Sequence, residues 1–130
     1  MKKFLLISLI ISSFNMNAEW VFVDESEGVL GVAKGSNLYV WKYYNTDDSG
    51  MRNFKILTNF KKIVANEASS IAKWGVYCNR PHRLYLQDVE GFNEKNGKGR
   101  SVYLEENVAY WITVPDDSVL RKSINMVCSN

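Results

Sequence analysis

The closing stretch of the chain, Trp111 to Asn130, most constrains what this sequence can fold into. Ser118 follows Pro115 and two aspartates, and its hydroxyl can accept a hydrogen bond from a backbone N–H in the first turn of a helix. The aspartates, Asp116 and Asp117, favour the positive end of the helix dipole. Apolar residues then recur at the spacing of one helix face: Leu120, Ile124, Val127 and Cys128. The other face is polar: Arg121, Lys122 and Asn125. We therefore expect a C-terminal amphipathic helix that carries Cys128 on its apolar face.

The first 18 residues are typical of a secretory signal peptide. Lys2 and Lys3 precede the apolar run 4–11, and Ala18 is a plausible cleavage point. The run is shorter than the roughly 20 residues that a membrane span needs. The alternative is a buried N-terminal helix. We expect export, to the periplasm, the medium or the cell surface. No cysteine directly follows the apolar run, so we expect no lipid anchor, and no later apolar stretch is long enough to span a membrane.

Removal of that segment leaves one domain, residues 19–130, whose charges balance. The full chain has 16 basic and 14 acidic residues, and loss of Lys2 and Lys3 leaves 14 of each. Recognition of nucleic acid would favour a clear basic excess, so a nucleic-acid partner is not expected.

The two cysteines, Cys78 and Cys128, predict one disulfide, because an exported chain with two cysteines usually joins them. The alternative is two free thiols or a bridge between chains. A bond that closes this loop stabilises the folded state by about 4 kcal/mol in the chain-entropy model.

Strand patterns fill most of the remaining chain. They predict strands near 20–24, 38–44, 71–78, 83–89 and 101–105, with a further segment at 109–111. Residues 51–70 are ambiguous, because Ile56, Phe60 and Ile63 fit helical spacing while the segment also contains strand fragments. We favour extended structure that becomes strand from about Ser70.

Strands followed by one helix predict an α+β fold: an antiparallel sheet of about five to six strands, with the C-terminal helix packed on one face and closed by one disulfide. Alternation places a set of side chains on the face of Cys78, which we expect to form the core: Trp74, Val76, Leu84, Leu86, Val102 and Leu104. The other face then presents Tyr77, Tyr85 and Tyr103. Tyr39, Trp41 or Tyr43 could join them, but the orientation of their strand is not assigned.

Candidates for catalysis are sparse. His82 is the only histidine, and a turn residue explains it better than a general base or a metal ligand. The pairs Asp116–Asp117 and Glu105–Glu106 fit a helix cap and a solvated strand end. Gly97-Lys98-Gly99 fits a hairpin loop better than a phosphate loop, which needs a strand–loop–helix setting. We expect no catalytic residue, no metal and no cofactor.

The order of these motifs resembles the surface-adhesin protein E family of small exported bacterial domains. The resemblance is carried by Val40-Trp41-Lys42-Tyr43-Tyr44, by Val76-Tyr77-Cys78 before Arg83-Leu84, and by Gly97-Lys98-Gly99 before Val102-Tyr103. It is carried above all by Trp111 and Val114-Pro115, followed by Ser118, a helix and Cys128. The resemblance implies an antiparallel sheet with a C-terminal helix, a Cys–Cys bridge, no catalysis, binding of host matrix or plasma proteins, and pairing of two copies through the sheet.

Two functions are consistent with these features. The first is a non-catalytic domain that binds a protein, or a second copy of itself, through the tyrosine-rich face, because tyrosine is enriched at interfaces. The alternative is that a second layer, such as residues 51–70, packs over that face. The second function is a periplasmic inhibitor or immunity protein that blocks an enzyme or toxin, with the loop 91–100 as its probe.

Overall fold

The computed structural model describes residues 19–28 and 32–129. The predicted signal peptide, residues 1–18, lies outside them. In the described part of the chain, strands run almost continuously until one C-terminal helix: β1 Trp20–Glu25, β2 Asn37–Trp41, β3 Asn45–Thr46, β4 Arg52–Val64, β5 Glu67–Val76, β6 Arg83–Phe92, the 3₁₀ turn η1 Lys95–Gly97, β7 Ser101–Glu105, β8 Tyr110–Thr113 and α2 Val119–Cys128.

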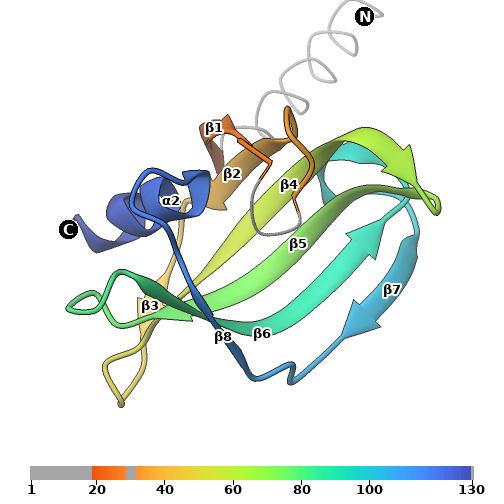
Figure 1. The fold of residues 1–130 in the computed structure, drawn as a ribbon. Coiled ribbons are helices and arrows are strands. Elements are labelled where there is room, and N and C mark those ends of the chain that lie inside the picture. Colours follow the sequence, from red (N-terminus) through yellow and green to blue (C-terminus); the bar gives the residue numbers. More distant parts are fainter. Residues whose placement is uncertain (1–18, 29–31, 130) are drawn as a thin grey trace, which may run out of the picture.

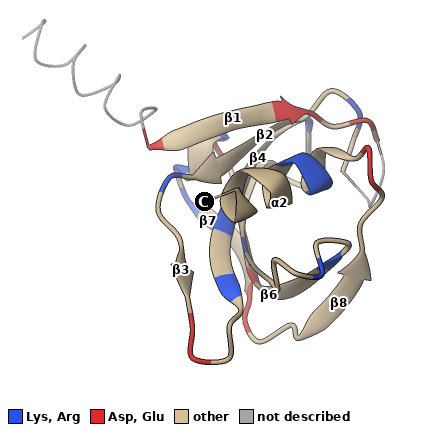
Figure 2. Cartoon of the chain, turned by 90° about the vertical axis from the view of Figure 1, so that its left-hand side faces the viewer, with Lys and Arg blue, Asp and Glu red and all other residues tan. Residues whose placement is uncertain are grey.

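All the strands join one antiparallel sheet, as the sequence predicted (Figure 1). The order is β1-β2-β4-β5-β6-β7, with the short strand β3 added to β4 and β8 added to β6. The long strands β4, β5 and β6 therefore form the centre of the sheet. Figure 2 shows the sheet curling around α2, with β1 and β2 on one side of the helix and β6 and β8 on the other.

Residues 51–70 form no separate layer, and the strand begins well before Ser70. They contribute β4 and the start of β5, which pair from Arg52↔Val76 to Val64↔Glu67. Ala65 and Asn66 both have positive φ, at 52° and 65°, as a two-residue hairpin turn of the primed type requires. The segment is thus the longest hairpin of the sheet, and it cannot cover the tyrosine-rich face as a second layer.

The core lies between α2 and the sheet. Ile124 and Val127 of the helix are fully buried, together with Val76 and Leu84 of the sheet. The core continues over β2 and β4 through Leu38, Val40, Phe54 and Ile56. Trp74 packs against this cluster as predicted, and Leu86 is half-buried.

The predicted core positions on β7 are wrong, and a bulge explains why. Lys73 pairs with Asp88 while Trp74 pairs with Leu86, so Gln87 is an extra residue on β6. An extra residue shifts the alternation of side chains along the rest of the strand. Leu104, which pairs with Glu90, is consequently turned away from the helix side and is 54% exposed. Val102 is only half-buried and lies outside the core cluster.

The C-terminal helix follows its sequence signals closely. The Ser118 hydroxyl accepts a hydrogen bond from the Arg121 N–H at 3.2 Å, and the apolar stripe is buried. Arg121, on the polar face of the helix, is largely buried. Its side chain is only 13% exposed and donates to the Val114 carbonyl and to Asp116.

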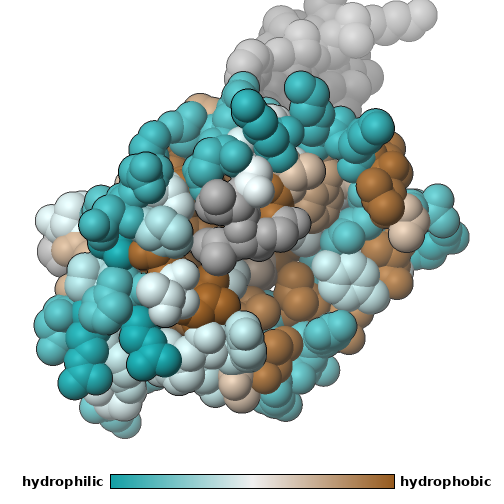
Figure 3. Space-filling model, viewed as in Figure 1, coloured by the Kyte–Doolittle hydropathy of each residue, from teal (hydrophilic) through white to brown (hydrophobic). Residues whose placement is uncertain are grey.

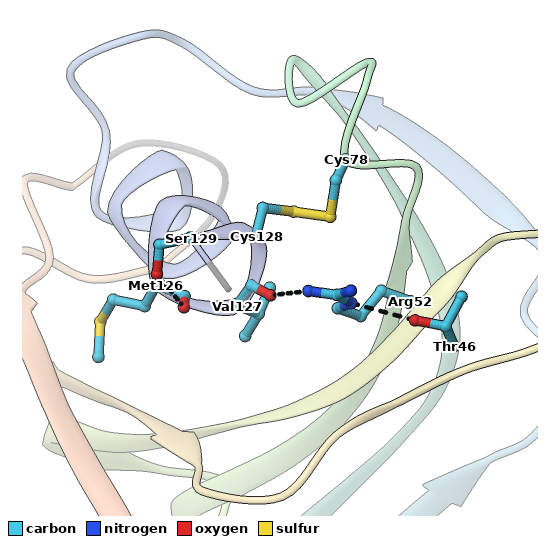
Figure 4. The surroundings of a disulfide bond; sticks show 7 residues. All are labelled: Thr46, Arg52, Cys78, Met126, Val127, Cys128 and Ser129. Atoms are coloured by element: carbon cyan, nitrogen blue, oxygen red, sulfur yellow. Dashed lines mark hydrogen bonds between the residues drawn. A yellow bond between two sulfur atoms is a disulfide. The ribbon is translucent and has the colours of Figure 1, made fainter.

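The predicted disulfide is present and joins Cys128 to Cys78, with 5.5 Å between the two Cα atoms. Figure 4 shows it linking the last turn of α2 to the loop after β5. Beside it, the Arg52 guanidinium donates to the Val127 carbonyl at 2.6 Å, so a β4 side chain satisfies an end of the helix. A disulfide of this kind fits an exported protein.

Within residues 19–28 and 32–129, none of the helices is long and apolar enough to cross a membrane.

Candidate functional site

Two of the three predicted tyrosines lie together on the side of the sheet opposite α2, hereafter the aromatic side. Tyr77 stacks on Trp111 with 6.2 Å between ring centroids, and Tyr85 contacts the same indole at 4.9 Å. The Arg83 guanidinium lies 5.1 Å from the Trp111 ring centroid, a cation–π distance. These residues, the β8 cluster, come together because Gly75, Tyr85 and Trp111 are neighbours across β5, β6 and β8.

Tyr103, the third predicted tyrosine, does not join them. It pairs with Gly91, beyond the bulge in β6, and therefore points to the helix side of the sheet. Burial, followed by the neighbouring Glu67 carboxylate, raises the pKa of Tyr103 above its usual value. Tyr103 is thus placed in a different environment from Tyr77 and Tyr85.

A second group of aromatic residues occupies the other end of the aromatic side. The rings of Trp20 and Trp41 meet edge to face at 4.8 Å, those of Phe22 and Tyr39 at 5.4 Å, and Tyr43 continues the row 6.2 Å from Trp41. Phe22 and Tyr43 are 51% and 59% exposed. In this β1–β2 cluster, Tyr39, Trp41 and Tyr43 lie on the same side of the sheet as Tyr77 and Tyr85. The orientation of their strand, which the sequence left open, is thereby assigned.

A groove of about 550 Å³ lies next to the β1–β2 cluster, toward the β8 cluster. Aromatic, amide and basic side chains line it: Trp41, Tyr43, Tyr44, Asn45, Asn53, Phe54, Lys55, Lys73 and Gln87. Its polar residues come from four neighbouring strands: Asn45 from β3, Asn53 and Lys55 from β4, Lys73 from β5 and Gln87 from β6. A Cβ at Gly75, beneath the groove, would lie 2.3 Å from the Met51 sulfur, so a larger residue there would displace the Met51 side chain.

Hydrogen bonds hold the groove floor in place. Gln87 donates to the Asn53 side-chain oxygen, and Asn53 donates to Asp47 at 3.4 Å. A hydrogen bond from the Ser49 side chain, followed by those from Asn53 and Met51, lowers the pKa of Asp47.

The groove itself is basic. The Lys55 amine lies 5.8 Å from the Trp41 ring centroid, while the Lys73 amine is 3.8 Å from Asp88 and 53% exposed. None of the nine lining residues is acidic. The groove can therefore receive an acidic or hydrogen-bonding group between aromatic walls.

The other residues that were considered for catalysis or metal binding occupy a turn and a helix cap. His82 is exposed in the turn before β6, and its carbonyl accepts from the Val114 N–H at 2.7 Å. Asp116 pairs with Arg121 at 2.7 Å. No group of three or more metal-ligating side chains is found among the residues that the structure describes.

The loop 91–100, suggested above as an inhibitory probe, packs back onto the sheet. Asn96 exchanges two hydrogen bonds with Asn59 of β4, at 2.7 and 2.8 Å, and Gly97 approaches Ile71 of β5. A loop docked in this way has little length left to enter the cleft of a target.

Trp111, Arg83 and the groove residues Asn53 and Lys55 were missed as site residues. Trp111 was placed in the predicted segment 109–111 and in the C-terminal motif, but its pairing with Tyr85 depends on the strand register, which the sequence does not give. Asn53 and Lys55 alternate with Phe54 and Ile56, and would have been assigned to this side had residues 52–64 been recognised as a strand.

The fold and site define an α+β domain whose antiparallel sheet curls around a disulfide-linked C-terminal helix and presents an aromatic, basic groove on its other side. Solved structures of Haemophilus influenzae protein E share this fold. Crystal form II matches with a TM-score of 0.67 at 13% identity, over 87% of this chain and 89% of that chain. Protein E from a non-typeable strain matches with a TM-score of 0.61 at 14% identity, over 84% and 76%. No protein-family model and no curated protein matches this chain.

Proposed function

We propose that this chain is an exported, non-catalytic domain that binds a protein through the aromatic side of its sheet. One observation carries the proposal: two aromatic clusters, with Phe22 and Tyr43 more than half exposed, occupy the aromatic side together with a basic groove. Tryptophan, tyrosine and arginine are the residues that most often dominate binding energy at protein interfaces.

The partner should offer carboxylates and apolar surface. Lys55 and Lys73 would pair with the carboxylates, while Trp41 and Tyr43 would pack on the apolar part. The resemblance of the sequence to the surface-adhesin protein E family supports a protein of the host matrix or plasma, and a partner in the producing cell or a second copy of the chain fits the same chemistry.

The test compares two tyrosines of equal exposure on opposite sides of the sheet. Tyr43 is 59% exposed beside the groove, and Tyr110 is 60% exposed on the strand position paired with Leu86, on the helix side. The purified chain is used to capture partners from matrix, plasma and periplasmic proteins, and the affinity of each captured partner is then measured.

We expect Tyr43→Ser to weaken binding by about tenfold or more, whereas Tyr110→Ser leaves it unchanged. Equal affinity of both variants would contradict the assignment of the groove. Unaltered melting temperatures would show that neither substitution acts through the fold.

A further inference from the structure

The β4–β5 hairpin ends in an apex, residues 60–66, that extends beyond its neighbour. β2 pairs with β4 only as far as Asn37↔Asn59, so the later residues of β4 are not paired with β2. Ile63 and Val64 are 61% and 68% exposed there. Figure 1 shows this end of the hairpin far from α2, and Figure 3 shows apolar surface in the same region.

The apex is shaped by a bulge. Asn59 pairs with Ser69 and Val64 with Glu67, so residues 60–63 lie opposite Ala68 alone. The groups freed by the bulge find partners in other segments: the Lys95 amine donates to the Phe60 carbonyl, and the Lys61 N–H donates to the Ser36 hydroxyl at 3.1 Å. The Asn59–Asn96 pair fixes its base. Ile63 and Val64 are therefore presented by an ordered projection.

Basic residues precede these two apolar residues along the chain and lie at the base of the apex. Lys61 and Lys62 precede them and are exposed. The Lys95 amine lies against the Phe60 carbonyl, and the Lys61 side chain lies over Gly35, where an added Cβ would be 2.8 Å from it. Glu67 pairs with Val64 across the hairpin, and its carboxylate lies beside Gly91 and Tyr103. Residues 19–130 carry 14 basic and 14 acidic residues, so this cluster is local and does not reflect an overall basic charge.

We propose that the apex is an anchor for an anionic lipid bilayer, in which Ile63 and Val64 enter the headgroup boundary while the lysines contact lipid phosphates. Apolar insertion and attraction of lysines to anionic lipid act together at such surfaces. A soluble polyanion would use the lysines equally well but would gain nothing from two adjacent β-branched side chains. This anchor shares no residue with the groove, so the proposal for each site can be tested independently of the other.

The test is flotation with vesicles of equimolar phosphatidylglycerol and phosphatidylcholine, compared with phosphatidylcholine alone. The protein is purified from the exported fraction of cells that express the full chain. Ile63→Ser with Val64→Ser removes the apolar tip, and Lys61→Gln with Lys62→Gln removes two charges. Val21→Ser, and Lys42→Gln with Arg80→Gln, are matched controls at exposed positions of β1 and of the loops after β2 and β5.

We expect binding to anionic vesicles only, weakened about tenfold by the apolar pair and about fivefold for each lysine removed. The controls should bind like the parent chain, and added salt should reduce binding. A parent chain that does not float overturns the proposal. Loss of binding in the lysine variant with full binding in the serine variant also overturns it, and would assign the apex to polyanions. Melting temperatures equal to that of the parent exclude unfolding as the cause.

Discussion

At the scale of single residues, Gly91 shows how a missing side chain can fix a local arrangement. A Cβ at this position of β6 would lie 2.3 Å from the Tyr103 ring and 2.5 Å from a Glu67 carboxylate oxygen. The ring of Tyr103 thus lies directly over the backbone of its cross-strand partner. Glycine in a strand interior often marks such a close approach.

Gly91→Ala should destabilise the fold by about 1–3 kcal/mol, because the added methyl group must displace Tyr103 or Glu67. Denaturant unfolding of the variant measures this loss. In a chain that carries Tyr103→Ala, Gly91→Ala should lower the free energy of unfolding by less than it does in the parent chain, since the two positions are in contact. Strict additivity of the two effects would contradict the proposed clash.

At the scale of elements, α2 is fastened to the sheet at both ends. The Val119 N–H donates to the Glu27 carboxylate at 3.0 Å near its start, and Arg52 reaches Val127 near its end. Between them, the Lys122 amine pairs with Asp24 of β1, and Figure 2 shows the acidic end of β1 next to the basic part of the helix. The hydrogen bond from Lys122 lowers the pKa of Asp24, and Asp24 raises the pKa of Lys122.

The pair should give α2 a dependence on acid. Because the pKa of Asp24 is lowered in the folded state, its contribution is present above the ordinary aspartate value of about 4 and is lost as the pH falls through the folded-state pKa. Asp24→Asn should therefore lower the melting temperature slightly at neutral pH and have no effect in strong acid. Asp48→Asn, at an exposed loop position, is the control. An equal effect of Asp24→Asn at both pH values would contradict the ion pair.

At the scale of the whole molecule, the fold class, the C-terminal helix and the disulfide were predictable, because each depends on local or countable signals. The cap at Ser118, the spacing of Leu120 and Ile124, and the presence of only two cysteines are of this kind. The β4 strand was not predictable in the same way. Ile56 is buried under the helix, whereas the adjacent Leu57 is buried on the other side, next to Gly97. Because β4 is buried from both sides, its apolar and polar residues do not alternate, and the spacing of its apolar residues also fits a helix.

Only part of the candidate site could be predicted from the sequence, for a related reason. Tyr77 and Tyr85 follow simple alternation from Cys78 and Leu84, and the structure brings them together. Tyr103 and Leu104 lie beyond the extra residue at Gln87, and a bulge that depends on the pairing of two strands leaves no mark in either strand alone.

Loss of the disulfide should affect the molecule as a whole. In the chain-entropy model the bond closing 50 residues contributes about 4 kcal/mol, out of a total on the order of 5–15 kcal/mol for a domain. Reduction, or Cys78→Ala with Cys128→Ala, should lower the melting temperature by about ten degrees or more, as calorimetry can measure. Capture of a partner at low temperature should survive in the fraction that stays folded. An unchanged melting temperature would contradict this account.

The disulfide also determines how the domain would carry mechanical load. Tension applied between its two ends would pass from Cys78 directly to Cys128, because the covalent bond is shorter than the chain between them. Strands β6, β7 and β8 lie inside this closed ring, so the pull could not draw them out along the chain while the bond is intact. Tyr85 and Trp111 belong to the ring, so under traction that peels β1 from β2 this part of the aromatic side would keep its geometry. The bond would thus limit how far this end of the sheet can be extended by tension on the chain.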